Sequence, residues 1–202
     1  SEMCIRDRYE HIVYAPYKHI YMQSLEGMRE RTIVCNSLSK TYSITGWRLG
    51  YVIANPQIID RVKKVHDFLT VGAAAPLMEA AVVGLEFGDG YYDELAAHYA
   101  HMKEVFVGGL KKLGLKYTDP QGAYYVLVDV SEFGVKDDVK FCEWMAQFVG
   151  VAAVPGSSFF REDVHNLVRF HFAKQDDTLN EAIKRLATLK EKAMNAKNVD
   201  WR

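Results

Sequence analysis

The feature that most constrains this chain is the stretch Ser37–Tyr51, which connects two short apolar segments. Those segments, Arg31–Asn36 and Leu49–Ala54, are rich in β-branched residues, a pattern typical of buried strands. The stretch therefore places Lys40 on a loop between two buried strands. Because a rigid scaffold fixes such loops, reactive side chains are often found on them. We expect Lys40 to be a functional lysine.

The residues around this lysine suit an aldehyde cofactor that carries a phosphate. A lysine amine can form a Schiff base with such an aldehyde, and pyridoxal phosphate is the commonest partner. Arg48 offers a planar, always-charged donor for the phosphate, and Ser37 and Ser39 offer hydroxyls. Gly46 would let the chain turn sharply and bring Arg48 back toward Lys40. A solvated loop lysine would explain the segment Ser37–Lys40 alone, but the whole string favours the cofactor.

The string closely resembles the cofactor-lysine motif of class I/II aminotransferases, which are fold-type I pyridoxal-phosphate enzymes. In that family Ser-x-x-Lys is followed by Thr-Gly-Trp-Arg-x-Gly. Three later segments, Pro120–Tyr125, Val154–Phe159 and Leu167–Ala173, resemble further family motifs in the expected order. The resemblance implies an α/β fold, the C-terminal part of the pyridoxal-phosphate-dependent transferase fold type I. It would comprise a remnant of the large, mainly parallel sheet domain and a smaller α+β domain.

The resemblance also implies roles for individual residues. Lys40 would be the catalytic residue that holds pyridoxal 5'-phosphate. Ser37, Ser39 and Arg48 would bind the cofactor with it, and the hydroxyl of Tyr9 would donate to the cofactor's phenolic oxygen.

Arg169 is the predicted substrate-binding residue. It lies in an alternating strand, Leu167–Phe172, and a buried arginine requires an anionic partner. The resemblance implies that this partner is the substrate α-carboxylate, held by two parallel hydrogen bonds. The alternative is a salt bridge to a local acid, Glu162 or Asp163.

The chain departs from the family pattern just before Tyr9. The family has an aspartate three residues before this tyrosine, and that carboxylate pairs with the protonated ring nitrogen. Here the position is occupied by Arg6, and Asp7 is one residue out of register. A cation there would disfavour ring protonation, so Asp7 could substitute only if the chain shifted.

The predicted domains follow from the same break. Residues 1–8 end the resemblance abruptly and read like translated adapter sequence, so we expect a non-native leader. Residues 9–95 would be the remnant of the large domain and 96–202 the small C-terminal domain. Because the cofactor lysine lies at residue 40, the resemblance covers about the C-terminal half of an aminotransferase, and we expect negligible activity from this chain alone.

The element order agrees with this division. We predict strands in the first domain at His11–Ala15, Arg31–Asn36 and Leu49–Ala54, followed by helices at Pro56–Phe68, from near Pro76, and at Tyr91–Leu113. The first of these helices would have an apolar side of Ile58, Ile59, Val62 and Val65. We predict strands in the second domain at Leu115–Thr118, Ala123–Val130, Val151–Val154 and Leu167–Phe172, with a helix at Asp137–Phe148. A last helix would begin at Thr178 with a capping box to Glu181 and an apolar stripe of Leu179, Ile183, Leu186 and Leu189.

Composition excludes several functional classes. The formal net charge of −1 argues against a charge-driven nucleic-acid or membrane partner. The longest apolar stretch, Phe68–Phe87, is interrupted by a proline and two glutamates. Three unpatterned cysteines suit a reducing cytoplasm and no thiol metal site. No histidine pattern indicates a metal; His98 and His101 share a helix face, where we expect them to be solvated.

These expectations define a reaction class. An intact protein would transfer an amino group from an L-amino acid to a 2-oxo acid in a ping-pong cycle, with Lys40 as base and acid. It would act as a cytoplasmic homodimer. Two alternatives remain open at this point: a pyridoxal-phosphate-dependent carbon–sulfur β-lyase, and the cofactor-binding domain of a transcription regulator.

Overall fold

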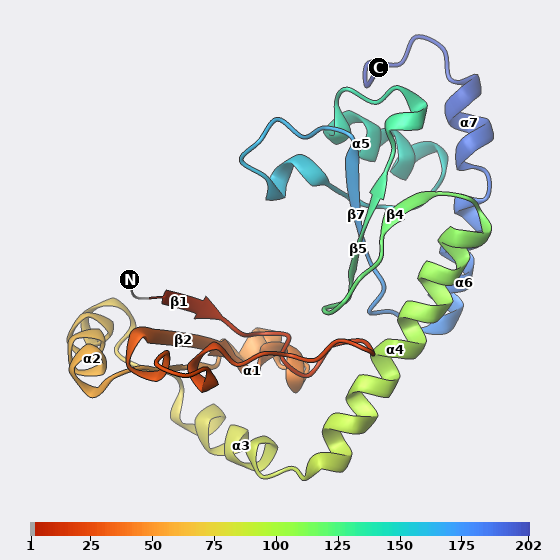
Figure 1. Ribbon diagram of the computed structural model, residues 1–202. Coiled ribbons are helices and arrows are strands. Elements are labelled where there is room, and N and C mark those ends of the chain that lie inside the picture. Colours follow the sequence, from red (N-terminus) through yellow and green to blue (C-terminus); the bar gives the residue numbers. More distant parts are fainter. Residues whose placement is uncertain (1–2) are drawn as a thin grey trace. The chain divides into compact units, whose positions relative to one another are not determined.

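The computed structural model describes the backbone of residues 3–202 and the side chains of residues 6–202. The chain forms two compact units, residues 1–96 and 97–202 (Figure 1). The long helix α4 (Asp89–Lys112) begins in the first unit and ends in the second. Among the described residues, no helix combines the length and apolar character needed to cross a bilayer.

The first unit contains a three-stranded sheet in the order β1 (Met3–Arg6), β2 (Thr32–Ser37), β3 (Gly50–Ile53). Strand β1 is parallel to β2, whereas β3 is antiparallel to it. Side chains alternate in burial along β2, with Thr32 and Val34 inside, as a strand with one covered face requires. The strands predicted on either side of Lys40 are therefore confirmed, but the prediction that both are buried is wrong, because every residue of β3 is exposed.

The strand predicted at His11–Ala15 is wrong, and β1 occupies that place in the sheet instead. Ile12 and Tyr14 are buried on alternate positions, which produced the strand-like pattern. Yet the Ile12 N–H donates to Tyr9 O and the Tyr17 N–H to Tyr14 O, so turns close on both sides of the segment. The proposal that residues 1–8 are a non-native leader stays a prediction; residues 1–2 lie outside the described part.

The first unit also contains three helices, α1 (Leu38–Thr41), α2 (Pro56–Thr70) and α3 (Ala75–Leu85). The short 3₁₀ helices η1, η2 and η3 are at Met22–Ser24, Arg29–Arg31 and Thr45–Trp47. Helix α2 begins as predicted, because Asn55 accepts a hydrogen bond from the Gln57 N–H at 3.0 Å and proline fills the first helical position.

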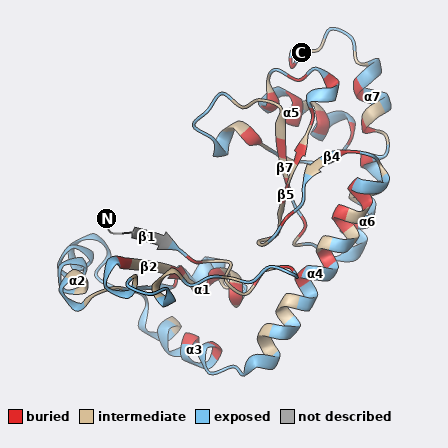
Figure 2. Cartoon of the chain, viewed as in Figure 1, coloured by how far each residue is buried: buried red, intermediate tan, exposed pale blue. Residues whose placement is uncertain are grey.

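The apolar side predicted for α2 is present, but it is not buried. No residue of α2 is buried, and Phe68 is 92% exposed. Figure 2 shows α2 and α3 mostly in the colour of exposed residues. One buried cluster of this unit consists of Leu38, Leu49 and Ala81, with Tyr42, Ile44 and Leu77 packed against it.

The second unit is built on an antiparallel sheet in the order β4-β5-β7-β6. Its strands are β4 (Lys116–Thr118), β5 (Tyr125–Asp129), β6 (Val154–Pro155) and β7 (Leu167–His171). Its helices, besides the end of α4, are α5 (Asp138–Phe148), α6 (Asp176–Leu186) and α7 (Leu189–Asn195), with the 3₁₀ helices η4 (Ser131–Phe133) and η5 (Gly156–Phe159).

This unit has a dense apolar core. Phe141, Phe172 and Leu110 are completely buried, and Trp201 near the C-terminus is 1% exposed. The Trp201 ring lies 5.1 Å from that of Phe141, and the Trp201 carbonyl accepts the Lys136 N–H at 2.7 Å. The C-terminal residues thus complete the core.

The predicted last helix is two helices, and its capping box is wrong. Helix α6 begins at Asp176, two residues before Thr178, and its N-cap makes no side-chain hydrogen bond. Glu181 instead binds Arg185 one turn later at 2.8 Å. The apolar stripe is confirmed at its buried members, Leu179, Leu186 and Leu189, the last of which begins α7.

Candidate active site

The loop that carries Lys40 begins with a capped helical turn. Ser37, the last residue of β2, is the N-cap of α1, and its Oγ accepts the Ser39 N–H at 3.3 Å. The two serine hydroxyls are also 2.9 Å apart. The hydroxyls of the two serines predicted as cofactor ligands thus lie side by side, and Ser39 directly precedes the lysine.

The amine of Lys40 points toward the end of the same loop. Its Nζ donates to Thr45 Oγ1 at 3.4 Å, and Thr45 Oγ1 in turn donates to the Ser39 carbonyl at 3.2 Å. Lys40 itself is half-buried. The sequence reasoning missed Thr45, although its position in the motif was visible.

Arg48 closes the loop, but not by the mechanism expected from Gly46. The backbone of Gly46 is not left-handed; the positive φ angles belong to Ser43 (56°) and Arg48 (59°). The Arg48 guanidinium donates to the Thr45 carbonyl at 3.0 Å and is exposed. The glycine that geometry requires is Gly50, where a Cβ would lie 2.4 Å from the Asn36 carbonyl oxygen.

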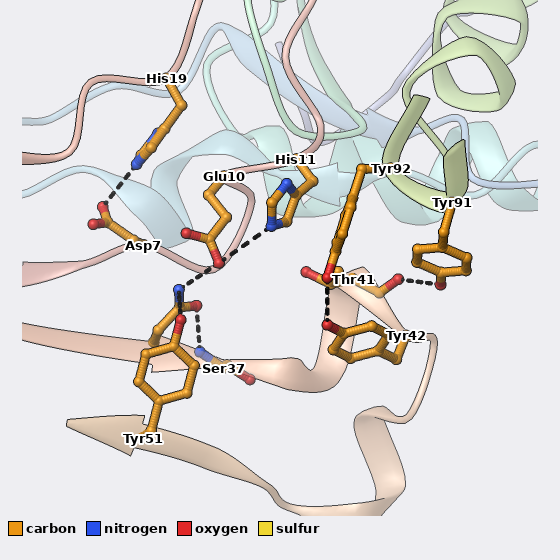
Figure 3. A network of polar contacts seen from close by, with 11 residues as sticks. Asp7, Glu10, His11, His19, Ser37, Thr41, Tyr42, Tyr51, Tyr91 and Tyr92 are labelled. Carbon is orange, nitrogen blue, oxygen red and sulfur yellow. Dashed lines mark hydrogen bonds and ion pairs between the residues drawn. The ribbon is translucent and has the colours of Figure 1, made fainter. Parts of the chain in front are cut away.

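A polar network lies beneath the lysine loop (Figure 3). The buried Asn36 amide donates to Glu10 Oε1 at 2.6 Å and to Tyr51 Oη at 2.9 Å, and its oxygen accepts the Ser37 N–H. Burial and then Glu10 raise the pKa of Tyr21 to about 12. Sequence analysis missed both residues: the only signal for Asn36 was a polar residue inside a strand pattern, and nothing in the pattern marked Glu10.

Three tyrosines link the lysine helix to the start of α4. Tyr91 Oη donates to the Thr41 carbonyl at 2.6 Å, which satisfies a carbonyl at the end of α1. Tyr42 and Tyr92 hydroxyls are 2.9 Å apart, and the His11 ring stacks on Tyr92 at 4.3 Å. Burial, and then the bond to Tyr92, raise the pKa of Tyr42, so it remains a phenol.

Asp7, the acid that precedes Tyr9, has a more suitable position for pairing with a ring nitrogen than its register in the sequence suggested. Arg6 is exposed, whereas Asp7 is 7% exposed and continues the pairing of β1 through its N–H to Cys35 O. One carboxylate oxygen of Asp7 lies 3.6 Å from His19, and the other is buried with no hydrogen-bond partner among the described residues. Such an orphaned acceptor is costly unless a donor completes it. Tyr9 itself is half-buried beneath the Arg8 guanidinium.

Arg169 belongs to the second unit and lies between aromatic rings. It is in the middle of β7, paired with Leu127 of β5 and Val154 of β6. Its guanidinium carbon is 3.6 Å from the Phe159 ring centroid and 4.2 Å from that of Tyr125.

Arg169 lines a cavity of about 430 Å³ together with Phe159, Tyr125 and the 118–122 turn. Among the described residues Arg169 has no salt bridge to Glu162 or Asp163, and Asp163 pairs with His165 at 2.8 Å.

Metal ligands are not grouped anywhere in the described part of the chain. His98 is exposed, as expected, but His101 pairs with Asp176 at 2.8 Å, a contact the sequence did not predict. Burial, followed by the charges of Lys174 and Arg169, lowers the pKa of His171 on the Arg169 strand.

Comparisons with known proteins identify the family. The chain belongs to the class I and II aminotransferase family, whose model matches residues 7–186. It is 36% identical over 182 residues to the methionine aminotransferase of Escherichia coli, covering 90% of this chain and 47% of that protein. A probable N-succinyldiaminopimelate aminotransferase, DapC, of Mycobacterium tuberculosis is 34% identical over 194 residues, covering 91% and 49%.

Solved structures show the same fold. The N-succinyldiaminopimelate aminotransferase from Mycobacterium tuberculosis matches with a TM-score of 0.87 and 32% identity, covering 93% of this chain and 50% of that one. The chain therefore has the C-terminal part of the fold-type I aminotransferase architecture, and it spans about half the length of the relatives it matches. The family is generally pyridoxal-phosphate-dependent.

Proposed function

We propose that this chain carries the lysine and carboxylate-binding residues of a transaminase that moves an amino group between an L-amino acid and a 2-oxo acid. The observation that carries the proposal is the loop in which Ser39, Lys40 and Arg48 all contact Thr45, while Ser37 caps the helical turn that bears the lysine. The relatives reported above are named aminotransferases, which favours transamination over β-elimination or a regulatory domain. The donor amino acid is left open.

The residues present fit pyridoxal phosphate. Arg48 with the Ser37 and Ser39 hydroxyls would hold the phosphate, and Tyr9 would donate to the phenolic oxygen. The orphaned, buried Asp7 oxygen is the acceptor that a protonated ring nitrogen requires. The chemistry supplied by the bound cofactor would be an aldehyde for the lysine and a ring that stabilises negative charge at the substrate α-carbon.

Three residues of this chain would then have separate roles in the reaction. The Lys40 amine would accept the proton from the substrate α-carbon and return it, as general base and acid. Thr45 Oγ1, 3.4 Å from that amine, would orient it. Arg169 would hold the α-carboxylate by two hydrogen bonds, oriented by the rings on either side of it. A homodimer and a cytoplasmic location remain predictions from the resemblance and the cysteines.

Chemical trapping tests the assignment of Lys40 without requiring turnover. The 202-residue chain is incubated with pyridoxal phosphate and reduced with borohydride, and the labelled lysines are mapped by mass spectrometry. We expect Lys40 to be labelled before the other lysines, and Lys40→Ala to remove that label alone. Lys184→Ala, at an exposed lysine of α6, is the matched control. Uniform labelling of all exposed lysines would contradict the proposal.

A further inference from the structure

A completely buried acid lies in the second unit, outside the residues assigned so far. Asp138 is the first residue of α5 and is 0% exposed. A buried carboxylate is tolerated only if hydrogen bonds satisfy it. Its two partners come from the two ends of one segment, the connection between β6 and β7.

Both ends of this connection are fastened to the same carboxylate. Asp138 Oδ2 accepts the Ser157 N–H at 2.8 Å, and Asp138 Oδ1 lies 3.0 Å from His165 Nδ1. Burial alone would raise the pKa of Asp138, but the bonds from Ser157 and His165 outweigh it and the pKa is lowered. The carboxylate is therefore ionised and accepts bonds from both ends.

The charge state of His165 decides how firmly the second end is held. Its Nε2 lies 2.8 Å from Asp163 while its Nδ1 faces Asp138. A neutral imidazole donates from one nitrogen only, whereas the imidazolium donates to both carboxylates. The bonds to Asp138 and then Asp163 raise the pKa of His165, and these two acids are the charged groups that face its ring.

The fastened segment carries the ring that covers Arg169. Phe159 ends η5, two residues after Ser157, and its ring centroid is 3.6 Å from the Arg169 guanidinium. At Gly156 a Cβ would lie 2.5 Å from the Leu167 carbonyl oxygen, so η5 is packed directly on β7. A shift of the Ser157 backbone would therefore carry Phe159 away from Arg169.

We propose that Asp138, with His165, is a positioning residue that holds Phe159 against Arg169 and so sets the affinity of Arg169 for a carboxylate. The carboxylate part of this proposal rests on the proposed function. The position of Phe159 does not, since both ends of the contact belong to this chain.

The alternative is that Asp138 only stabilises the start of α5. Removing it would then lower stability but leave the ring on Arg169 in the folded protein. Nuclear magnetic resonance on the 202-residue chain separates the two, because ring currents from Phe159 and Tyr125 displace the Arg169 side-chain protons upfield.

We expect Asp138→Asn to reduce this displacement to about half in the folded protein, since only the Tyr125 ring stays in place. Asp163→Asn is the matched control: its carboxylate is exposed and contacts only the outer nitrogen of His165, so the displacement should stay near the wild-type value at pH 5.5. A folded Asp138→Asn protein with the wild-type displacement overturns the proposal.

Two further measurements decide the matter if Asp138→Asn does not fold. In the wild type, the displacement should decrease as the pH rises through the raised pKa of His165, because the charge that strengthens its bond to Asp138 is then lost. In His165→Gln it should be smaller and independent of pH. A displacement that is constant between about pH 5 and 9 in the wild type, and equal in His165→Gln, overturns the proposal.

Titration with 2-oxoglutarate tests the carboxylate part. We expect saturable shifts of the Arg169 and Phe159 signals in the wild type, no such shift of the Phe159 signals in Arg169→Gln, and a Kd about tenfold higher in Asp138→Asn. If the wild type shows no saturable shift, the assigned role of Arg169 is wrong, while the ring-current measurement still decides the role of Asp138. An unchanged Kd in a folded Asp138→Asn protein overturns the effect on affinity.

Discussion

The two units of this chain differ in how completely they bury their apolar side chains. The second unit encloses Phe141, Leu110 and Phe172 completely, and its C-terminal Trp201 closes the core. In the described part of the first unit, helices α2 and α3 leave large side chains such as Phe68 exposed (Figure 2). Since hydrophobic burial is the main stabilising term in folding, the second unit should be the more stable one.

The candidate site residues differ in the same way. Arg169 is supported by aromatic rings and a buried acid of its own unit, whereas Lys40 depends on hydroxyls and backbone carbonyls of a short loop. An apolar core can therefore fix a charged residue in place, whereas the loop around Lys40 relies on hydrogen bonds and on tight backbone packing at Gly50.

The largest expected effect comes from truncating a side chain in the apolar core of the second unit. Phe141→Ala should lower the free energy of unfolding of the second unit by about 3–5 kcal/mol, because the side chain is completely buried and the cavity cannot fill. Phe68→Ala, at a 92% exposed position, is the control and should change stability by less than about 0.5 kcal/mol. Urea unfolding followed by tryptophan fluorescence measures both variants. Equal losses of stability would contradict the conclusion that the second unit buries its apolar side chains more completely.

A pair of glycines tests the backbone packing of the lysine loop. Gly50→Ala should cost about 1–3 kcal/mol, because its Cβ would meet the Asn36 carbonyl oxygen and disturb Ser37 opposite it. Gly46→Ala has open space and no left-handed backbone, so it should be neutral within about 1 kcal/mol. Hydrogen exchange at the β2 amides is the measurement. If Gly46→Ala lowers stability more than Gly50→Ala does, the loop conformation depends on the glycine of the motif and not on the contact between Gly50 and β2.

Arg169→Lys should have a smaller effect. A lysine keeps the charge but loses the planar group that stacks between Phe159 and Tyr125, which should cost about 0.5–2 kcal/mol. Thermal unfolding of the second unit measures the loss, with Lys184→Arg on exposed α6 as a control for charge-preserving exchange. No change in Tm would show that the rings do not stabilise the guanidinium.

The smallest effect is expected at the exposed pair of His101 and Asp176. The hydrogen bond to Asp176 raises the pKa of His101 from 6.5, so its stabilisation is full below that value and is lost as the pH rises through the raised pKa. His101→Gln should therefore lower Tm slightly at pH 5.5 and leave it unchanged at pH 9. His98→Gln, one turn earlier with its ring edge-on to that of Tyr99, is the control. A loss of equal size at both pH values would contradict this reading.

Local signals in the sequence predicted most helices and strands within a few residues. Asn55 and Pro56 fixed the start of α2, and alternation around Val168 and Phe170 fixed β7. The errors arose where a local pattern competed with contacts distant in sequence. Ile12 and Tyr14 alternate like a strand but lie between two turns, and Thr178 resembles an N-cap but lies inside α6.

The site residues show the same division between local patterns and contacts that are distant in sequence. Ser37, Ser39, Lys40 and Arg48 were recognisable because a single short motif contains them. Asn36, Glu10 and the Asp138–His165 pair were not, since their partners are up to 27 residues away and only folding makes them adjacent.

The sequence by itself determined the family, the order of elements and the lysine that the family motif requires, because these depend on short-range patterns of residue type. Tertiary structure alone decided that the carboxylate of Asp7 is buried, although Arg6 occupies the position of the family's aspartate. It also decided which rings cover Arg169, and that one face of α2 is left open to solvent. The physical reason is that burial and hydrogen-bond partners are properties of the packed chain, and a pattern of residue types does not specify them.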